Sequence, residues 1–327
     1  MSVIFTGLVT ILVGVGGMIV YFWGANYLLD RVIYPARGEN IGHNVRRATA
    51  IRPWLFVFPA VFALGLYLVV PVFYSIWLSL TSGVAAQRGT FANYSEIFQN
   101  GTFRVALLNN VLWVLVVPAA STFFGLLAAQ LTDRLSWGNI AKSLVFMPMA
   151  ISFVGASLIW SFVYHPNPEI GILNALRGIF GADRGVTFID GNIVDSFWLM
   201  VVLIWIQTGF AMVILSAALR GVPEDTIEAA IVDGANPFQI FFKIKVPQIM
   251  PTILVVWTTI TILVLKVYDI VAAMGSQYRN LEILPTQMMQ YFDSGNYGFA
   301  TAISVVIMIL VLPVMVWNIR QARSEVR

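Results

Sequence analysis

Long apolar stretches alternate with short polar segments along the whole chain. Each stretch has the length of about 20 apolar residues that a helix needs to cross the hydrocarbon of a bilayer. Because a lipid-facing backbone must satisfy its own hydrogen bonds, we expect the stretches to be helical. The pattern predicts an all-α, polytopic membrane protein with seven transmembrane helices, at Val3 to Trp23, Trp54 to Leu80, Val105 to Leu131, Ser143 to Tyr164, Phe197 to Leu219, Thr252 to Met274 and Tyr297 to Ile319.

Composition supports a membrane protein. Of the 327 residues, 59% are hydrophobic and 11% are charged, and the mean hydropathy is +0.82, a balance that a soluble core of this size does not need. The chain has no cysteine, which excludes disulfides, thiolate catalysis and cysteine metal sites. No basic residue precedes the first apolar stretch, so we interpret it as a retained span rather than a removed signal peptide.

The basic residues predict the orientation, because Lys and Arg are retained on the cytoplasmic side. The larger group of basic residues is assigned to the cytoplasm, and it comprises Arg31, Arg37, Arg46, Arg47, Arg52, Arg134, Lys142, Arg220, Lys243, Lys245, Arg320, Arg323 and Arg327. The smaller group, assigned to the outside, comprises Arg88, Arg104, Arg177, Arg184 and Arg279. With seven crossings, this places the N-terminus outside and the C-terminus in the cytoplasm. The net charge of +3 reflects this bias and gives no indication of nucleic-acid binding.

The chain divides at its polar segments. Residues 1–53 would form an extra N-terminal transmembrane helix and a cytoplasmic Arg-rich linker, with the loop from Gly24 to Pro53 as the main internal boundary. Residues 54–103 would hold the second transmembrane helix and an outer loop, and residues 104–327 a five-helix core. A cytoplasmic hairpin is expected at residues 220–250. Prolines within the spans, Pro148 among them, are compatible with kinks.

The hairpin is predicted by helix start and stop signals. Pro223 suits a first helical position, acidic residues follow it in the first turn, and Gly234 can end the helix in the left-handed conformation. Asn236 then caps a second helix, which Pro247 closes. On the first helix Ile227, Ala230 and Ile231 share a face, with Ala229 and Ala230 leaving room for another backbone, and Phe238, Phe241 and Phe242 form a knob on the second. Such a hairpin either inserts into a partner's groove or lies on its own membrane domain.

Four parts of this segment carry a family resemblance: Glu228-Ala229-Ala230, Asp233-Gly234-Ala235, Phe238-Gln239 and Ile244 to Pro247. They resemble the EAA loop of permease subunits of bacterial ABC importers, which have the type I importer fold. In that family the loop is the coupling hairpin, and its helix docks in a cleft of a cytoplasmic ATPase. The resemblance implies ATPase-docking roles for Glu228, Ala229, Ala230, Asp233, Gly234, Phe238 and Phe241.

Further segments resemble the sugar-importing members, including maltose-type, glycerol-phosphate-type and α-glucoside-type permeases. These are "NNVLW" from Asn109, "LKVYDIV" from Leu265 and "YGFATAIS" from Tyr297. The resemblance covers roughly Arg104 to Arg320. It implies a second permease subunit, two cytoplasmic ATPase subunits that bind ATP and Mg, an extracytoplasmic solute-binding protein, and a place in the bacterial inner membrane. Gly275-Ser276-Gln277 departs from the Thr-Gly-Gly of many relatives, which weakens inference about substrate contacts in the outer loop.

Polar and aromatic residues within the spans are candidates for a substrate path. Lys266 and Asp269 are the charges well inside a span, and at a spacing of three they can pair on one helix face. A sugar is bound by hydrogen-bonding groups beside aromatic faces, which makes Asn110, Trp160, Trp205, Gln207 and Tyr268 candidates. Interfacial anchoring of Trp and Tyr, and hydrogen bonds between helices for Asn and Gln, explain these residues equally well.

Other functions remain as alternatives. An ion-coupled carrier would use buried acids and inverted halves, but the sequence shows one intramembrane Asp and no repeat. A non-sugar solute is also compatible with an ABC permease. A membrane enzyme could hold Mg²⁺ with Glu224, Asp225, Glu228 and Asp233. We expect no catalytic residue, metal or cofactor on this chain, because "GNIAKS" at Gly138 lacks P-loop spacing and His43 and His165 lie on opposite sides.

Overall fold

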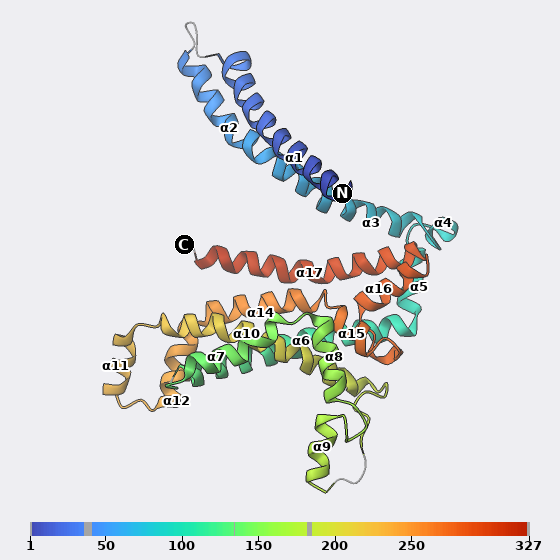
Figure 1. Cartoon of the computed structure of the whole chain (residues 1–327), viewed down its shortest axis with the longest axis vertical. Helices are drawn as coiled ribbons and strands as arrows, with labels where there is room; N and C mark the ends of the chain where they lie inside the picture. The colour runs from blue at the N-terminus through green and yellow to red at the C-terminus, as the bar shows by residue number, and fades with distance from the viewer. Residues whose placement is uncertain (1, 36–40, 134, 182–184, 326–327) are drawn as a thin grey trace. The chain divides into compact units, whose positions relative to one another are not determined.

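The computed structural model describes residues 2–35, 41–133, 135–181 and 185–325. These residues form helices and no strand, which confirms an all-α fold (Figure 1). Arg37, Arg134, Arg184 and Arg327, used for the orientation, lie outside the described residues. Among the described residues five helices are long and apolar enough to cross a membrane, or seven if two bent helix pairs each form one span. The five are Ile4–Ile33, Ile41–Thr81, Gly101–Thr132, Ser196–Arg220 and Tyr297–Trp317.

One bent pair replaces a straight helix expected from the sequence, and the other joins the second hairpin arm to the sixth span. In the fourth apolar stretch, Gly138–Ala150 and Phe153–Val163 meet at 106°. Ile151 and Ser152 are extended there, and the Ser152 hydroxyl accepts from the N–H of Gly155 at 3.1 Å, which caps the second piece. The other pair, Pro237–Gln248 and Met250–Val264, meets at 69° beside Ile249.

The expected helix from Thr252 to Met274 is wrong in its second half. The helix α14 (Met250–Val264) ends ten residues early, and the short α15 (Asp269–Met274) begins after a non-helical break at residues 265–268. Irregular backbone at membrane depth is tolerated only where protein or a water-filled cavity covers it. The break therefore indicates a protein-lined or hydrated position for Lys266 and its neighbours.

The chain separates into two compact units, residues 1–74 and 75–327. In the first, α1 (Ser2–Tyr27) continues into a π-helix, η1 (Leu28–Ile33), and packs beside α2 (Ile41–Leu64) (Figure 1). The Tyr21 hydroxyl donates to the carbonyl of Leu55 at 2.9 Å, and Arg52 pairs with Asp30 at 2.6 Å. The segment 24–53 was expected to be a loop, but its described residues are mostly helical and Pro53 lies inside α2.

The remaining helices are of three kinds: those at the boundary of the two units, the long helices of the bundle, and short helices between them. Two join the first unit to the second: η2 (Gly65–Val69) and α3 (Val70–Thr81). Long bundle helices are α6 (Gly101–Thr132), α10 (Ser196–Arg220), α14 and α17 (Tyr297–Glu325). The shorter ones are α4 (Ala85–Arg88), α5 (Ala92–Gln99), α7 (Gly138–Phe146), η3 (Met147–Ala150), α8 (Phe153–Val163), α9 (Ile172–Ile179), η4 (Ile193–Asp195), α11 (Glu224–Val232), α12 (Pro237–Ile240), η5 (Phe241–Lys245), α13 (Val246–Gln248), η6 (Arg279–Leu281) and α16 (Leu284–Asp293).

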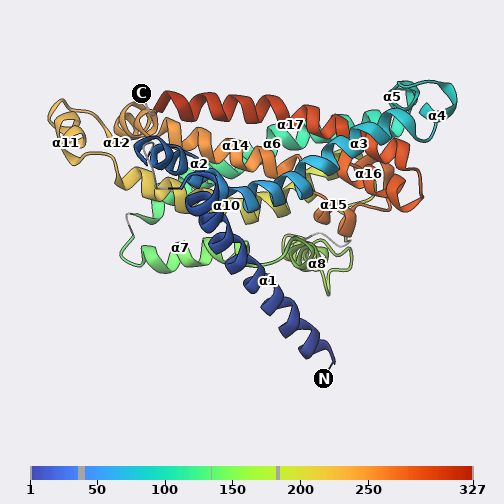
Figure 2. The same ribbon diagram turned by 90° about the horizontal axis from the view of Figure 1, so that it is seen from above.

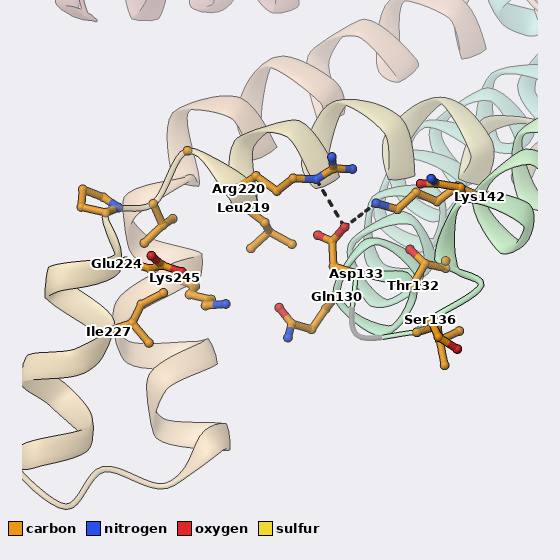
Figure 3. A pocket seen from close by; sticks show the side chains of 16 residues that line it. Gln130, Thr132, Asp133, Ser136, Lys142, Leu219, Arg220, Glu224, Ile227 and Lys245 are labelled. Carbon is orange, nitrogen blue, oxygen red and sulfur yellow. Dashed lines mark hydrogen bonds and ion pairs between the residues drawn. The ribbon is translucent and has the colours of Figure 1, made fainter.

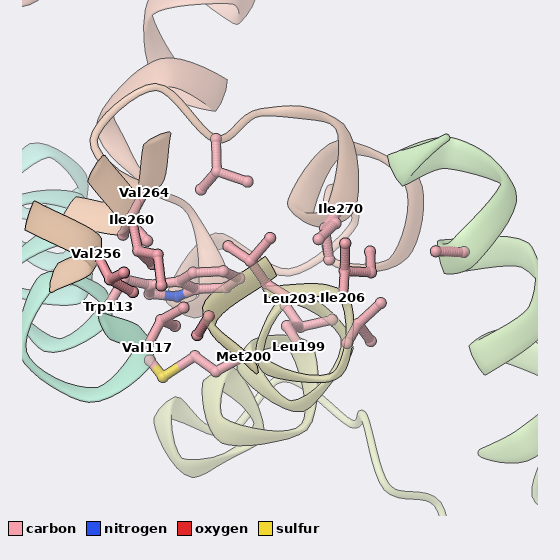
Figure 4. Close-up of a cluster of buried hydrophobic side chains, with 14 of the residues drawn as sticks. Trp113, Val117, Leu199, Met200, Leu203, Ile206, Val256, Ile260, Val264 and Ile270 are labelled. Atoms are coloured by element: carbon pink, nitrogen blue, oxygen red, sulfur yellow. The ribbon is translucent and has the colours of Figure 1, made fainter. Parts of the chain in front are cut away.

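The second unit is built around α6, α10 and α14. Figure 2 shows α17 on one side of this group and α7 and α8 on the other. Their shared core contains Trp113, Leu203 and Ile260, each at most 1% exposed (Figure 4). Small residues bring α6 and α10 together, since a Cβ on Gly125 would lie 2.4 Å from the Cβ of Ala211. Close backbone approach through small residues is the usual way in which transmembrane helices associate.

The described residues contain three π-helical segments, and each ends two residues before a proline. These are η1 before Pro35, η2 before Pro71 and η5 before Pro247. Proline lacks the N–H that would bond to the carbonyl four residues earlier, and its ring clashes with that carbonyl. For Pro71 and Pro247, where the helix continues, the residue four positions earlier lies in the π segment, and a wider turn relieves the clash. Pro35 instead follows the end of its helix.

Candidate functional site

The hairpin expected at residues 220–250 is present. Its first arm, α11, follows Pro223 and carries Glu224 and Asp225 in its first turn. The helix ends in a Schellman motif: Ala235 N–H donates to Ala230 O at 2.9 Å and Gly234 N–H to Ile231 O at 3.0 Å. Gly234 has φ +80°, a conformation that side chains with a Cβ rarely adopt. The predicted start and stop of this arm are confirmed.

The second arm begins as the sequence predicts and ends differently. Asn236 and Gln239 form a reciprocal capping box, with N–H to side-chain oxygen distances of 2.9 and 2.8 Å. Pro247 was expected to close the helix, but α12, η5 and α13 follow one another through Pro247 to Gln248. The chain turns instead at Ile249, directly before α14.

The hairpin presents an apolar crest to its surroundings, which we define as Ile231, Val232, Phe238 and Phe242. Val232 is 87% and Phe238 76% exposed. In a soluble context such a patch marks an interaction site, because water-exposed apolar surface is otherwise kept small. Glu228, Ala229, Asp233 and Gly234 are also exposed beside the crest.

Three residues of the predicted faces lie differently. Ala230 is 8% exposed and lies inside the hairpin, so it leaves no room for an incoming backbone. Phe241 is half-buried against the core cluster and is separate from the knob formed by Phe238 and Phe242. Ile227 is partly buried against the core cluster, whereas Ile231, one turn later on the same helix, is 58% exposed.

A polar groove of about 770 Å³ lies at the root of the hairpin (Figure 3). Asp133, at the end of α6, forms an ion pair with Lys142 of α7 and approaches Arg220 Nε of α10 at 3.4 Å. The buried Ser216 hydroxyl lies among them, 2.8 Å from Lys142 Nζ and 3.2 Å from Asp133 Oδ1. This network ties three helix ends together beneath the hairpin. Sequence reasoning missed it because the residues are widely separated in the chain and form no local motif.

Asn110 connects α6 to the start of α16. Its Oδ1 accepts from Leu284 N–H at 2.6 Å, and neighbouring Asn109 donates to the carbonyls of Asn280 and Glu282 at 2.8 and 2.9 Å. Asn110 is 2% exposed. These bonds fasten the segment 280–284 to α6, which is the helix-joining role that the sequence left open for Asn110.

Trp160 and Trp205 belong to an aromatic cluster formed by α8, α10 and Phe188 of the loop before α10. Their rings lie edge to face with centroids 5.7 Å apart, and Tyr164 lies 5.1 Å from Trp160. Both tryptophans are half-buried, and Gln207 of α10 is 5% exposed. Edge-to-face packing holds the C-terminal half of α8 against the N-terminal half of α10 and uses part of the ring surface that a sugar would need.

Lys266, Tyr268 and Asp269 lie at the break after α14. Lys266 and Tyr268 are exposed on this chain, and Asp269 is half-buried in the first turn of α15. The expected ion pair between Lys266 and Asp269 does not form, because the backbone between them is not helical and their three-residue spacing does not bring the charges together. Within the described part of the chain, no three Asp, Glu or His side chains come together as a cation site requires.

Comparisons with known proteins agree with this architecture. The α-glucoside transport system permease protein AglF of Rhizobium meliloti (strain 1021) is 53% identical, over 99% of both chains. The osmoprotective compounds uptake permease protein GgtC of Synechocystis sp. (strain ATCC 27184 / PCC 6803 / Kazusa) is 42% identical, over 83% of this chain and 99% of its own. A chain in the crystal structure of a bacterial alginate ABC transporter has the same fold, with a TM-score of 0.72 and 20% identity over 88% of this chain and 98% of that one.

The family assignment comes from the sequence profile. Residues 121–324 match the profile described as the binding-protein-dependent transport system inner membrane component. That range contains the hairpin, the core of α10 and α14, and the break at residues 265–268. This chain therefore belongs to the family of inner membrane components of binding-protein-dependent transport systems, the permeases of ABC importers, and is a multi-pass protein of the bacterial inner membrane.

Proposed function

We propose that this chain is one of two permease subunits that enclose an ATP-driven path for a carbohydrate delivered by a solute-binding protein. Membership of the importer permease family supports the transport role. The observation that carries the coupling mechanism is the hairpin between α10 and α14, whose apolar crest is left exposed by the residues that the structure describes. A hairpin exposed in this way suits a groove on another protein.

The substrate we propose is a di- or oligosaccharide with an α-glucosidic linkage. The near full-length relative at 53% identity is an α-glucoside permease, and a trehalose/maltose permease of Thermococcus litoralis is 26% identical over 84% of this chain and 94% of its own. In the transport path, the break at residues 265–268 exposes Tyr268 and Lys266. An aromatic face and a donor side by side are suited to a sugar ring and its hydroxyl groups.

The coupling step follows from the geometry of the hairpin. Two cytoplasmic ATPase subunits would bind ATP and Mg, and each would receive the hairpin of one permease subunit in a cleft. The crest supplies apolar contact, and Glu228 and Asp233 beside it supply charge for orientation. Movement of the ATPase would reach α6, α7 and α10 through the ion-pair network at the hairpin root. The permease itself would carry out no catalysis.

We further propose seven crossings with the N-terminus outside and the C-terminus in the cytoplasm. Five helices are span candidates, and the bent pair in the fourth apolar stretch supplies another. The seventh crossing is the sixth stretch, α14 with α15, because the first half of the second bent pair is the hairpin arm. The basic residues at the hairpin, Lys243 and Lys245, then lie in the cytoplasm, as the positive-inside rule favours.

Crosslinking tests this function directly. A cysteine at Val232, in a chain that has none of its own, is expected to capture an ATPase subunit in native membranes, with a yield that changes on addition of ATP. Ala230→Cys, buried within the hairpin, serves as the matched control and should crosslink little. Capture of no ATPase from Val232→Cys or Phe238→Cys would contradict the proposed coupling.

Uptake tests the substrate. The intact importer in liposomes should accumulate maltose or trehalose with internal ATP, and cellobiose, with its β linkage, should not compete. Transport that needs an ion gradient in place of ATP would instead favour a carrier. ATP-driven uptake of none of the α-glucosides would restrict the proposal to another solute class.

A further inference from the structure

The short helix α9 (Ile172–Ile179) turns its apolar side chains outward, whereas a helix on the surface of a soluble protein turns them towards the core. Its outward face consists of Ile172, Ala175, Leu176 and Ile179, all exposed, and Phe180 continues it. Ile179 is 77% and Phe180 88% exposed. In water a surface helix turns such a stripe towards the core and its polar residues towards solvent. Here the apolar stripe faces away from the protein.

The polar side chains of α9 face inward and fix this orientation. Asn174 is 1% exposed, and it donates to the carbonyls of His165 and Val186 at 2.8 and 2.9 Å. Its Oδ1 accepts from Val186 N–H at 2.9 Å and from Arg177 Nη1 at 3.1 Å. With all of these bonds formed, rotating α9 to bury its apolar stripe would leave several polar groups without partners.

Close backbone packing reinforces the orientation. A Cβ on Gly171, directly before α9, would lie 2.0 Å from the carbonyl oxygen of His165, and a Cβ on Gly185 would lie 1.8 Å from that of Pro166. Leu173, on the inner side of the helix, packs against the main core cluster. The packing of Gly171, Gly185 and Leu173 therefore fixes α9 with its apolar stripe facing outward.

The stripe continues an exposed apolar surface on a membrane-span candidate. The preceding helix, α8, belongs to a membrane-span candidate and exposes Val154, Leu158, Ile159 and Phe162. Only eight residues separate the end of α8 from the start of α9, and Ile170 among them is also exposed. Figure 1 shows α9 extending from α8 on the side of the second unit away from α17.

We propose that α9 is an interfacial anchor that lies in the outer leaflet of the bilayer with Ile172, Leu176, Ile179 and Phe180 among the lipid acyl chains. Short amphipathic helices bind membranes in this way when an apolar face is buried just beneath the headgroups. The anchor would hold the outer loop 165–196 at the membrane surface while α8 and α10 change their arrangement during transport.

Spin-label accessibility tests the anchor in the intact importer reconstituted in liposomes. Because the chain is free of cysteine, single labels can be placed by Ile172→Cys, Leu176→Cys and Ile179→Cys, with Ala175→Cys as a further position on the same face. Leu158→Cys on α8 is the lipid reference, and Glu169→Cys, exposed in the same loop, is the water reference. Each variant must retain ATP-dependent uptake.

The expected result is a ratio of oxygen to nickel-chelate accessibility that is several-fold higher on α9 than at Glu169→Cys and close to that of Leu158→Cys. Nickel accessibility equal to that of the water reference would place the stripe in solvent and overturn the proposal. Low accessibility to both reagents would mean that another protein subunit covers the stripe, which also overturns it. Neither result would affect the proposed sugar transport, because the readout does not depend on substrate.

Discussion

Asn110 Oδ1 accepts a 2.6 Å hydrogen bond from the backbone N–H of Leu284, the first residue of α16. The two residues are 174 positions apart, and both are buried. One side chain thus satisfies an N–H at the start of one helix and fastens it to the middle of another. The role of Asn110 is consequently positional, and it need not touch a substrate to affect transport.

Asn110→Ala is expected to destabilise the purified complex by about 1–3 kcal/mol, because the buried N–H of Leu284 loses its partner. A thermal unfolding midpoint in detergent measures the effect. Asn139→Ala, at an exposed position, is the control and should leave the midpoint unchanged. A variant with normal stability and lost uptake would show instead that Asn110 acts on the substrate.

Gly125→Ala is expected to destabilise the packing of α6 against α10 by about 1–3 kcal/mol, since the new Cβ would meet the Cβ of Ala211 at 2.4 Å. Adding Ala211→Gly should restore part of the loss, because the backbone N of Met212 at 2.9 Å remains close. Gly101→Ala, with open space around it, is the matched control. Additive effects of the two substitutions, measured by thermal unfolding, would contradict this packing.

Gly234→Val is expected to disrupt the end of α11, because a residue with a Cβ at φ +80° costs about 1–2 kcal/mol. Hydrogen exchange at the amides of Gly234's neighbour Ala235 should accelerate roughly 5- to 30-fold. Gly234→Asn, which tolerates the left-handed conformation better, should change exchange much less. Equal exchange in both variants would show that the glycine conformation does not limit the stability of this arm.

Glu282, in the segment between α15 and α16, makes the stability of the folded chain depend on pH. Burial raises the pKa of its carboxyl above the ordinary value of 4.5, while a hydrogen bond from Gln290 and the charge of Arg279 oppose the shift; Tyr291 is the other titratable group that senses its charge. One carboxylate oxygen, Oε2, has no hydrogen-bond partner among the described residues. The folded chain therefore holds this proton more tightly than the unfolded chain does.

The protonated, neutral form of Glu282 favours the folded chain. Its contribution to the free energy of unfolding is fully present below the ordinary glutamate pKa of 4.5 and is lost as the pH rises through the raised pKa of the folded chain. Glu282→Gln, which stays neutral, is expected to be more stable than the wild type at pH 8 and similar at pH 4. The gain should be about 1.4 kcal/mol for each unit by which the pKa is raised. Unfolding midpoints across this range measure it, with Glu169→Gln as the exposed control; a gain of equal size at both pH values would contradict the titration of Glu282.

The sequence predicted most of the apolar helices and the boundaries of the first hairpin arm because both depend on local signals. Helix length, Gly234 and the Asn236 cap act within a few residues. The bend in the fourth stretch and the break in the sixth were missed, since largely apolar residues stand on both sides of Ser152 and of residues 265–268. Hydropathy indicates that a segment lies in the membrane, but it carries little information about where the helix axis bends.

The candidate site was predicted only in part, for a related reason. Ala230 and Phe241 face inward because the hairpin folds on its own base, which residue spacing along a helix cannot reveal. Lys266 and Asp269 do not pair because the helix expected to carry both is interrupted. The groove around Asp133 joins residues from α6, α7 and α10, so it exists only after the chain has folded.

The π turn η5 also bears on how this hairpin can change in evolution. Each helical residue rotates the chain by about 100°, so losing one residue between Phe241 and Lys245 would turn the crest by that angle relative to α14. The loss would also restore the clash that the wider turn relieves at Pro247. Descendants of this permease should therefore gain or lose the extra residue and the proline together.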